Sequence, residues 1–61
     1  MLNILYEAGR FWVRREQFGK TLGFAVYENN GTAARRVASI GFAGDEGLRR
    51  AIVEADRRAG H

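Results

Sequence analysis

The sequence contains no cysteine, a single histidine at its last position and a single serine. Without cysteine, neither a disulfide framework nor a thiolate metal site can form, which agrees with a reducing compartment. With His61 as the one imidazole, the usual ligands of transition metals are missing. Ser39 has no general base at a recognisable spacing, and the glycines form neither GxGxxG nor a phosphate loop. We therefore expect a protein that is not an enzyme and that uses no metal and no cofactor.

Long apolar runs and proline-rich linkers are missing too. The apolar runs are too short to span a membrane, and the start MLNILYEAGR lacks the basic segment and apolar stretch of a signal peptide. No repeat or low-complexity segment marks a boundary, so residues 1–61 are expected to form one small domain. At 46% hydrophobic and 28% charged residues, the composition is typical of a folded globule. We expect a soluble, cytoplasmic protein.

Positive charge is distributed unevenly along the chain. The formal net charge is +3. Residues 1–42 contain six bases and three acids, whereas residues 43–61 contain four of each. The positive excess therefore lies wholly in the first two thirds of the sequence, where a binding surface for an acidic partner is best sought.

Apolar residues recur at spacings of three and four over residues 45–59, which predicts an amphipathic helix. Asp45 is the expected N-cap, and Gly60 suits the left-handed position just past the helix end. The apolar stripe consists of Leu48, Ala51, Ile52, Ala55 and Ala59.

The arginines of this helix have acids four residues before them, which predicts ion pairs along the helix surface. We interpret these arginines as a solvated, self-paired face rather than as a binding site. The expected pairs are Asp45 with Arg49, Glu46 with Arg50, and Glu54 with Arg58.

Before the helix, alternation of apolar and polar residues predicts strands at about residues 11–17, 22–29 and 33–42. Asn30 and Gly31 suit a tight hairpin turn, because such a turn can require positive φ at both central residues. Residues 2–7 either add a fourth strand, paired through Ala8 and Gly9, or pack as an extended arm. The predicted fold is α+β: a three-stranded, or with this segment four-stranded, antiparallel β-meander packed on one face by a C-terminal α-helix.

The same alternation sorts the strand side chains onto two faces of the sheet. The more apolar set is expected to face the helix: Phe11, Val13, Leu22, Phe24, Val26, Ala38, Ile40 and Phe42. The other set is expected to form an open face: Trp12, Arg14, Glu16, Gly23, Ala25, Tyr27, Arg35, Val37 and Ser39. A β-bulge would shift this register, but the adjacent pairs Arg14-Arg15 and Arg35-Arg36 would still leave a basic residue on the open face.

The expected open face combines arginines, large aromatics and very small residues, which indicates a nucleic-acid-binding surface. Arginine presents a planar fork of donors that reaches phosphate oxygens or a guanine edge. Gly23 and Ala25 would let a ligand backbone approach closely, while Trp12 and Tyr27 could stack on bases. Lys20, in the turn between the first two strands, could reach flanking phosphates. The predicted nucleic-acid-binding residues are Trp12, Arg14, Arg15, Lys20, Tyr27, Arg35 and Arg36.

Other interpretations of the same residues stay open. Trp12 and Tyr27 could form a cross-strand aromatic pair that only stabilises the sheet, or could be covered by the N-terminal segment. The same face could instead bind another protein, as a non-enzymatic adaptor or inhibitor, or a second copy of the chain. Salt dependence separates these alternatives, because phosphate contacts weaken steeply with salt and an aromatic protein interface does so less.

The layout resembles the DNA-binding domains built from a three-stranded sheet and a helix, namely the arm-binding domains of tyrosine-type integrases and the ethylene-response-factor domain of plants. The resemblance rests on the element order over residues 11–59, the basic aromatic first strand RFWVRRE and the terminal helix. It implies that the sheet, rather than the helix, enters the major groove, so that DNA is the expected nucleic acid. The resemblance implies which face of the sheet binds DNA, but it assigns no individual binding residues. With a net charge of only +3, binding by a single copy is expected to be salt-sensitive and of low specificity.

Overall fold

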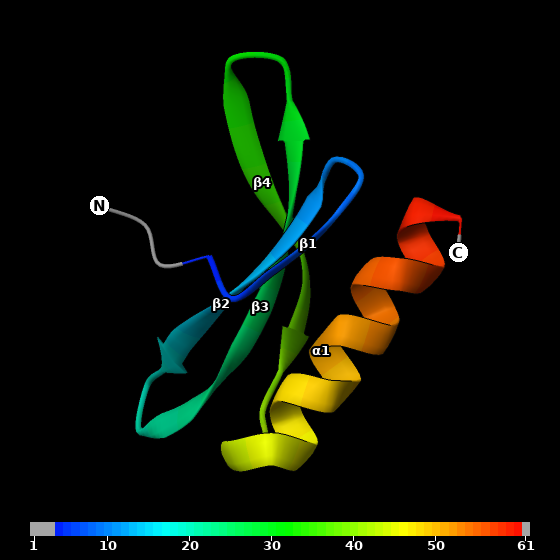
Figure 1. Ribbon diagram of the computed structural model, residues 1–61. Helices are drawn as coiled ribbons and strands as arrows, with labels where there is room; N and C mark the ends of the chain where they lie inside the picture. The colour runs from blue at the N-terminus through cyan, green and yellow to red at the C-terminus, as the bar shows by residue number, and fades with distance from the viewer. Residues whose placement is uncertain (1–3, 61) are drawn as a thin grey trace.

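The computed structural model describes residues 4–60, in which four antiparallel strands precede one helix (Figure 1). The elements are β1 (Tyr6–Ala8), β2 (Phe11–Phe18), β3 (Thr21–Asn30), β4 (Ala33–Ile40) and α1 (Gly44–Ala59), and the strands lie in that order in one sheet. The α+β meander with a C-terminal helix is thus confirmed. The segment before β2 does add a strand, a three-residue one, whereas residues 2 and 3 and His61 lie outside the described residues.

The hairpin between β3 and β4 turns one residue later than expected. Asn30 pairs with Ala33 inside the ladder, so the loop consists of Gly31 and Thr32. Gly31 has a φ of 72°, and within residues 4–60 no residue other than glycine has a positive φ. The turn therefore needs left-handed backbone at its first position only, where glycine adopts it without a Cβ clash, and Asn30 remains in the strand.

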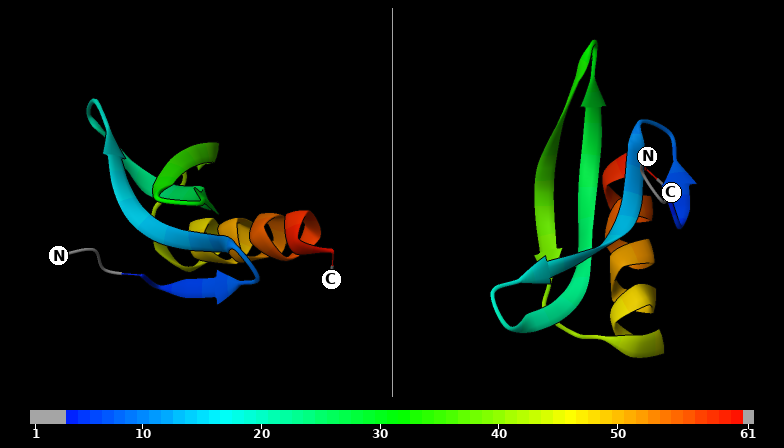
Figure 2. Two further views of the ribbon diagram at one scale, coloured as in Figure 1. Left: turned by 90° about the horizontal axis from the view of Figure 1, so that it is seen from above. Right: turned by 90° about the vertical axis from the view of Figure 1, so that its left-hand side faces the viewer.

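Helix α1 covers one face of the sheet and encloses the core (Figure 2). Val13, Phe24 and Val26 point toward the helix and pack against Ala51 and Ala55, and all five are buried. Alanine at the contact lets the helix axis lie close to the strands, so small helical residues and large strand residues interdigitate. Within residues 4–60, no second helix lies on the opposite face of the sheet.

The two ends of α1 differ in how well the sequence predicted them. Asp45 is not the N-cap, because the helix begins one residue earlier at Gly44 and Ala43 occupies the capping position without a side-chain hydrogen bond. Asp45 instead adds negative charge in the first turn, which favours the helix dipole. Gly60 ends the helix in the left-handed conformation, as predicted.

A β-bulge in β4 changes which of its residues face outward. Val26 pairs with Ala38 while Tyr27 pairs with Arg36, so Val37 is the extra residue. The expected positions of Arg35 and Val37 on the open face are therefore wrong, because one inserted residue inverts the alternation. Val37 packs against the core, and Arg36 takes the outward place.

Leu22 and Phe42 do not join the core, although both were expected to face the helix. Each is about half exposed, at 52% and 50%. The sheet is strongly twisted, and its β2–β3 hairpin bends away from α1, while Phe42 follows the last paired residue of β4 (Figure 2).

Within residues 4–60, no helix is long and apolar enough to cross a membrane.

Candidate nucleic-acid interface

The sheet face that points away from α1, here called the outer face, carries polar and aromatic side chains from three strands. Pairing places Trp12 beside Tyr27, Arg14 beside Ala25, and Glu16 beside Gly23. Across the bulge, Tyr27 in turn pairs with Arg36. The outer face is therefore made of Trp12, Arg14, Glu16, Gly23, Ala25, Tyr27, Arg36 and Ser39.

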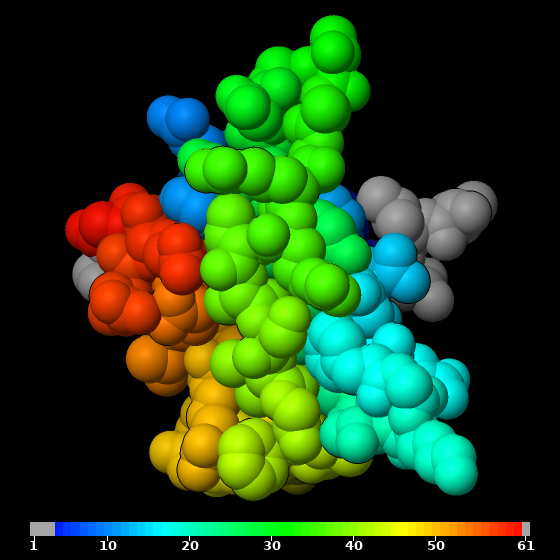
Figure 3. Space-filling view, turned by 180° about the vertical axis from the view of Figure 1, so that it is seen from behind, coloured from blue at the N-terminus to red at the C-terminus, as the bar shows by residue number. Residues whose placement is uncertain are grey.

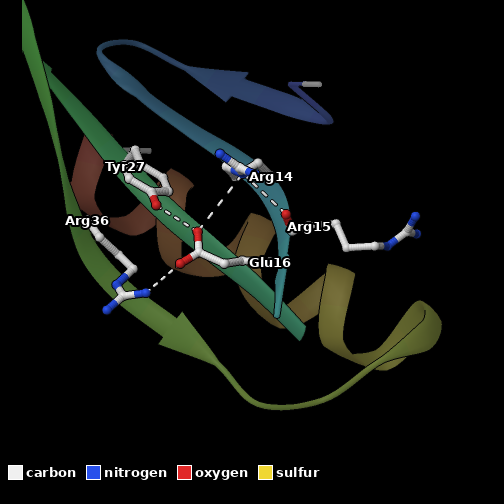
Figure 4. Close-up of polar contacts among 5 residues, drawn as sticks. All are labelled: Arg14, Arg15, Glu16, Tyr27 and Arg36. Carbon is white, nitrogen blue, oxygen red and sulfur yellow. Dashed lines mark hydrogen bonds and ion pairs between the residues drawn. The ribbon is translucent and has the colours of Figure 1, made fainter. Parts of the chain in front are cut away.

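Glu16 is at the centre of a polar cluster on this face (Figure 4). The Tyr27 hydroxyl donates a hydrogen bond of 2.6 Å to Oε1 of Glu16, and an amino group of Arg36 donates one of 2.5 Å to Oε2. The Nε of Arg14 lies 4.0 Å from Oε1. We call Arg14, Glu16 and Arg36 the Glu16 triad. The hydrogen bond to the Glu16 carboxylate, aided by partial burial, raises the pKa of the Tyr27 hydroxyl above its ordinary value.

A second group of the same composition lies on the other side of the sheet. Glu28 stands 3.6 Å from Arg10 and 3.4 Å from Arg35, and we call these three residues the Glu28 triad. Glu28 pairs with Phe11, and Phe11 packs against the core. The Glu28 triad therefore lies on the same face of the sheet as the core and α1. Arg35 and Arg36 are thus separated onto opposite faces, as neighbouring residues of a strand are.

Exposure distinguishes the arginines of both triads from their glutamates. The side chains of Glu16 and Glu28 are each 18% exposed, whereas those of their four arginines range from 36% to 72%. The carboxylates are therefore recessed, and the guanidinium groups are the outermost charged atoms. Each triad keeps a net charge of +1 and presents it to solvent.

Trp12 does not offer the exposed ring that base stacking requires. It is 3% exposed, its ring stacks on Tyr27 with centroids 4.6 Å apart, and its Nε1 donates a hydrogen bond of 2.9 Å to the Asn29 side chain. The cross-strand aromatic pair that the sequence left open as an alternative is confirmed. Trp12 is consequently a structural support for Tyr27 and Asn29.

The small residues of β3 are also used by the protein itself. A Cβ at Gly23 would overlap the carbonyl oxygen of Ile40, so the end of β4 crosses the space that a side chain would fill. Ala25 is fully buried. The expected close approach of a ligand backbone at these two positions is therefore wrong, because the protein's own backbone already occupies that place.

The remaining predicted residues lie at the edges of the outer face or beyond it. The guanidinium carbon of Arg15 lies 5.6 Å from the centre of the Phe24 ring, so Arg15 points to the helix side, and Figure 4 shows it directed away from the Glu16 triad. Lys20 is exposed in the β2–β3 loop, two residues after Phe18, whose ring lies 5.4 Å from the Arg36 guanidinium carbon.

Of the predicted residues, the structure thus brings Arg14, Tyr27 and Arg36 together, while Lys20 lies in the β2–β3 loop. The structure separates Arg15 and Arg35 from them. Alternation assigned Glu16 to this face, but Glu16 was not among the predicted binding residues. The signal for its central role is that it is the one acid in the alternating outward set of β2 and β3.

Within residues 4–60, no group of three or more histidine, cysteine, aspartate or glutamate side chains is placed to hold a metal ion. No protein-family model matches the chain, and the searches found no similar curated protein and no similar solved structure. The candidate interface therefore rests on the geometry of the residues themselves.

Proposed function

We propose that this protein binds DNA through the outer face of its sheet, with Arg14 and Arg36 as the main phosphate contacts. The observation that carries the proposal is the layering of charge in the Glu16 triad, where two exposed guanidinium groups lie over a recessed carboxylate. A phosphate that approaches this face meets arginine before it meets glutamate. Lys20, exposed in the β2–β3 loop, adds a further positive charge for flanking phosphates.

Glu16 gives the arginines a defined direction. Its carboxylate holds Arg36 by one oxygen, while the other oxygen accepts the Tyr27 hydroxyl and lies near Arg14. A guanidinium group has five N–H donors, so donors of Arg36 that do not face Glu16 are available to phosphate oxygens. A held side chain loses less conformational entropy on binding, so this arrangement favours affinity despite the low net charge.

The β3–β4 hairpin supports a duplex as the target. It extends past the C-terminal end of α1 as a two-stranded ribbon, and its tip carries the polar residues Asn29, Asn30 and Thr32 (Figure 1). A two-stranded ribbon fits the major groove, where short polar side chains can contact base edges. With so few basic residues, we expect weak, salt-dependent binding with little sequence preference by a single copy.

The test is a titration of fluorescently labelled random duplex and single-stranded DNA at low and at physiological salt. The wild type is compared with Arg14→Gln/Arg36→Gln and with the control Arg57→Gln/Arg58→Gln, which removes the same charge from the helix. We expect the outer-face variant to lose about tenfold or more in affinity at low salt and the helix variant about twofold. If both variants lost the same affinity, the loss would be explained by the lower net charge alone and not by the outer face. No binding by the folded wild type at low salt would contradict the proposal and favour a protein partner for the outer face.

A further inference from the structure

β4 lies at an edge of the sheet, and its outer side has no backbone partner. Within residues 4–60, β4 pairs with β3 only, and no turn or loop forms a backbone hydrogen bond with it. Every second residue of such a strand points its N–H and C=O groups outward, where an added strand can pair with them. The space-filling view shows β4, in green, in front of the other elements (Figure 3). This edge is therefore open to an extended chain, whereas β1, at the opposite edge, has only three residues.

The side chains along this edge are small except for two arginines. Residues 33–36 are all exposed, and they consist of two alanines followed by Arg35 and Arg36. Further along the strand, Ala38 and Ser39 are small as well. Small side chains leave room on both faces for the side chains of a strand that pairs alongside.

The two arginines place positive charge on both faces of the sheet at this edge. Arg35 belongs to the Glu28 triad and Arg36 to the Glu16 triad, and each triad has two arginines for one carboxylate. The Arg35 side chain is 72% exposed and the Arg36 side chain 45%. β4 itself contains no acidic residue. A strand added here therefore meets an excess of positive charge on each of its faces, at adjacent positions.

We infer that β4 binds an extended, acidic segment of a partner protein by strand addition. The backbone of the segment pairs with the outer edge of β4, and two adjacent acidic side chains, which point to opposite faces, meet Arg35 and Arg36. The β-bulge at Val37 bends the strand, so the pairing centres on residues 33–36 and takes about four to six residues of the partner.

The charge and the backbone groups of this edge together select this occupant. A peptide strand offers backbone donors and acceptors at the spacing of β4, which a nucleic acid does not. A second copy of β4 is a poor match, because pairing of the two strands brings four arginines together. Arg36 also belongs to the proposed DNA contacts, whereas Arg35 does not, so the two proposals are tested separately.

The probe is a labelled hexapeptide of valine and threonine, blocked at both ends, with two adjacent glutamates at its centre. Fluorescence anisotropy without nucleic acid should give a dissociation constant of about 10–100 µM. One control peptide has glutamines in place of the glutamates. The other keeps the glutamates but has a proline on each side of them, which removes backbone donors and prevents strand pairing. Each control should bind about tenfold more weakly. No binding of the probe up to about 1 mM protein, or equal binding of either control, would overturn the inference.

A matched pair of protein variants tests the position of the site. Arg35→Gln should weaken probe binding about fivefold, because it removes the charge on one face of the edge. Arg57→Gln is the control, since Arg57 is 71% exposed and also contacts one glutamate, and it should change probe binding by less than about twofold. Equal effects of the two variants would contradict the site. In the duplex titration, Arg35→Gln should change DNA affinity by no more than about twofold, so a failure of this inference is distinguishable from a failure of DNA binding.

Amide hydrogen exchange, measured residue by residue by NMR, separates strand addition from a contact between side chains alone. With saturating unlabelled probe, the outward amides of residues 33–36 should exchange about threefold to tenfold more slowly, because they gain hydrogen-bond partners. Exchange along α1 should not change. Unchanged exchange throughout residues 33–36 with the probe bound would overturn the inference.

Discussion

Arginines flank a glutamate both on the helix and on the sheet, but the two regions assemble this group differently. On α1, Glu46 and Glu54 each hold arginines three and four residues later in the sequence. On the sheet, the two arginines of Glu16 come from β2 and β4, and Arg36 is 20 positions away from Glu16. The helix groups thus follow from the helical period alone, whereas the sheet groups require a folded sheet with one particular register.

This difference bears on where a partner binds. The arginines of α1 are offset by equal numbers of acids over residues 43–61, so the helix carries no net charge. The two sheet groups carry two of the three excess positive charges, and all of their arginines except Arg14 contact a glutamate from another part of the chain. A surface whose charge is both in excess and fixed is the better candidate for contact with phosphate.

The largest expected effect is a loss of stability that starts in the sheet. It should disrupt the ion pairs of the sheet groups but not the contacts within the helix groups. Gly23→Ala places a Cβ where the Ile40 carbonyl lies, so β4 must move or lose its pairing. We expect a loss of about 2–4 kcal/mol in the free energy of unfolding, measured by urea denaturation. Gly41→Ala is the matched control, since no atom lies within 4 Å of a Cβ there, and it should change stability by less than about 0.5 kcal/mol. Equal stability of the two variants would contradict the crossing of β4 over Gly23.

The next effect separates the two faces of the sheet. Glu16→Gln removes the recessed negative charge beneath Arg14 and Arg36 but keeps an amide oxygen that can accept the Arg36 hydrogen bond, so DNA affinity at low salt should rise about threefold to tenfold. Glu28→Gln makes the same change in the triad on the other face and should alter affinity by less than about twofold. The labelled-duplex titration measures both. An equal rise in the two variants would show that DNA does not distinguish the faces.

The features predicted correctly from the sequence are mostly those that depend on residues close to one another in the chain. The helix, predicted at 45–59, spans Gly44–Ala59, and the Glu46–Arg50 and Glu54–Arg58 pairs are confirmed because helical spacing alone brings them together. The predicted pair of Asp45 with Arg49 is wrong, because Arg49 donates a hydrogen bond to Glu46 instead. Glu46 lies three residues before Arg49 and also accepts a hydrogen bond from Arg50. Local spacing therefore predicted which residues could meet, and competition between near neighbours decided which did.

The outer face was predictable only up to the bulge. Alternation correctly placed Arg14 and Tyr27 together, and the adjacent arginines ensured that one of them would face outward. That Val37 is the extra residue, and hence that Arg36 rather than Arg35 joins Glu16, depends on how β4 packs on the core. The burial of Trp12 likewise goes with its contacts to Tyr27 and Asn29 of another strand, which have no signature in a short run of residues.

Acid should weaken the helix groups in a defined direction. Hydrogen bonds from Arg50 and Arg49 lower the pKa of Glu46, and a hydrogen bond from Arg57 lowers that of Glu54, in each case from an ordinary value of 4.5. A lowered folded-state pKa adds stability that is present above the ordinary value and is lost as pH falls through the folded value. Glu46→Gln/Glu54→Gln should thus be less stable than wild type at pH 7, and the difference should shrink between about pH 5 and about pH 3. Thermal unfolding at several pH values measures it, and a difference that stays constant would contradict the carboxylate contacts.

The smallest effect, in the titration of Tyr27, tests the sheet group most directly. The Glu16 hydrogen bond raises the Tyr27 pKa above 10.0, and the charges of Arg14 and Arg36 partly oppose this. The protonated hydroxyl therefore stabilises the fold below pH 10, and this contribution is lost as pH rises through the folded value. By ultraviolet absorbance of tyrosinate, Glu16→Gln should lower this pKa and Arg36→Gln should raise it. Glu54→Gln, the equivalent change on the helix, should leave it unchanged, because only the sheet register brings a glutamate to Tyr27. If the Tyr27 pKa were the same in Glu16→Gln as in the wild type, this would contradict the hydrogen bond between Tyr27 and Glu16.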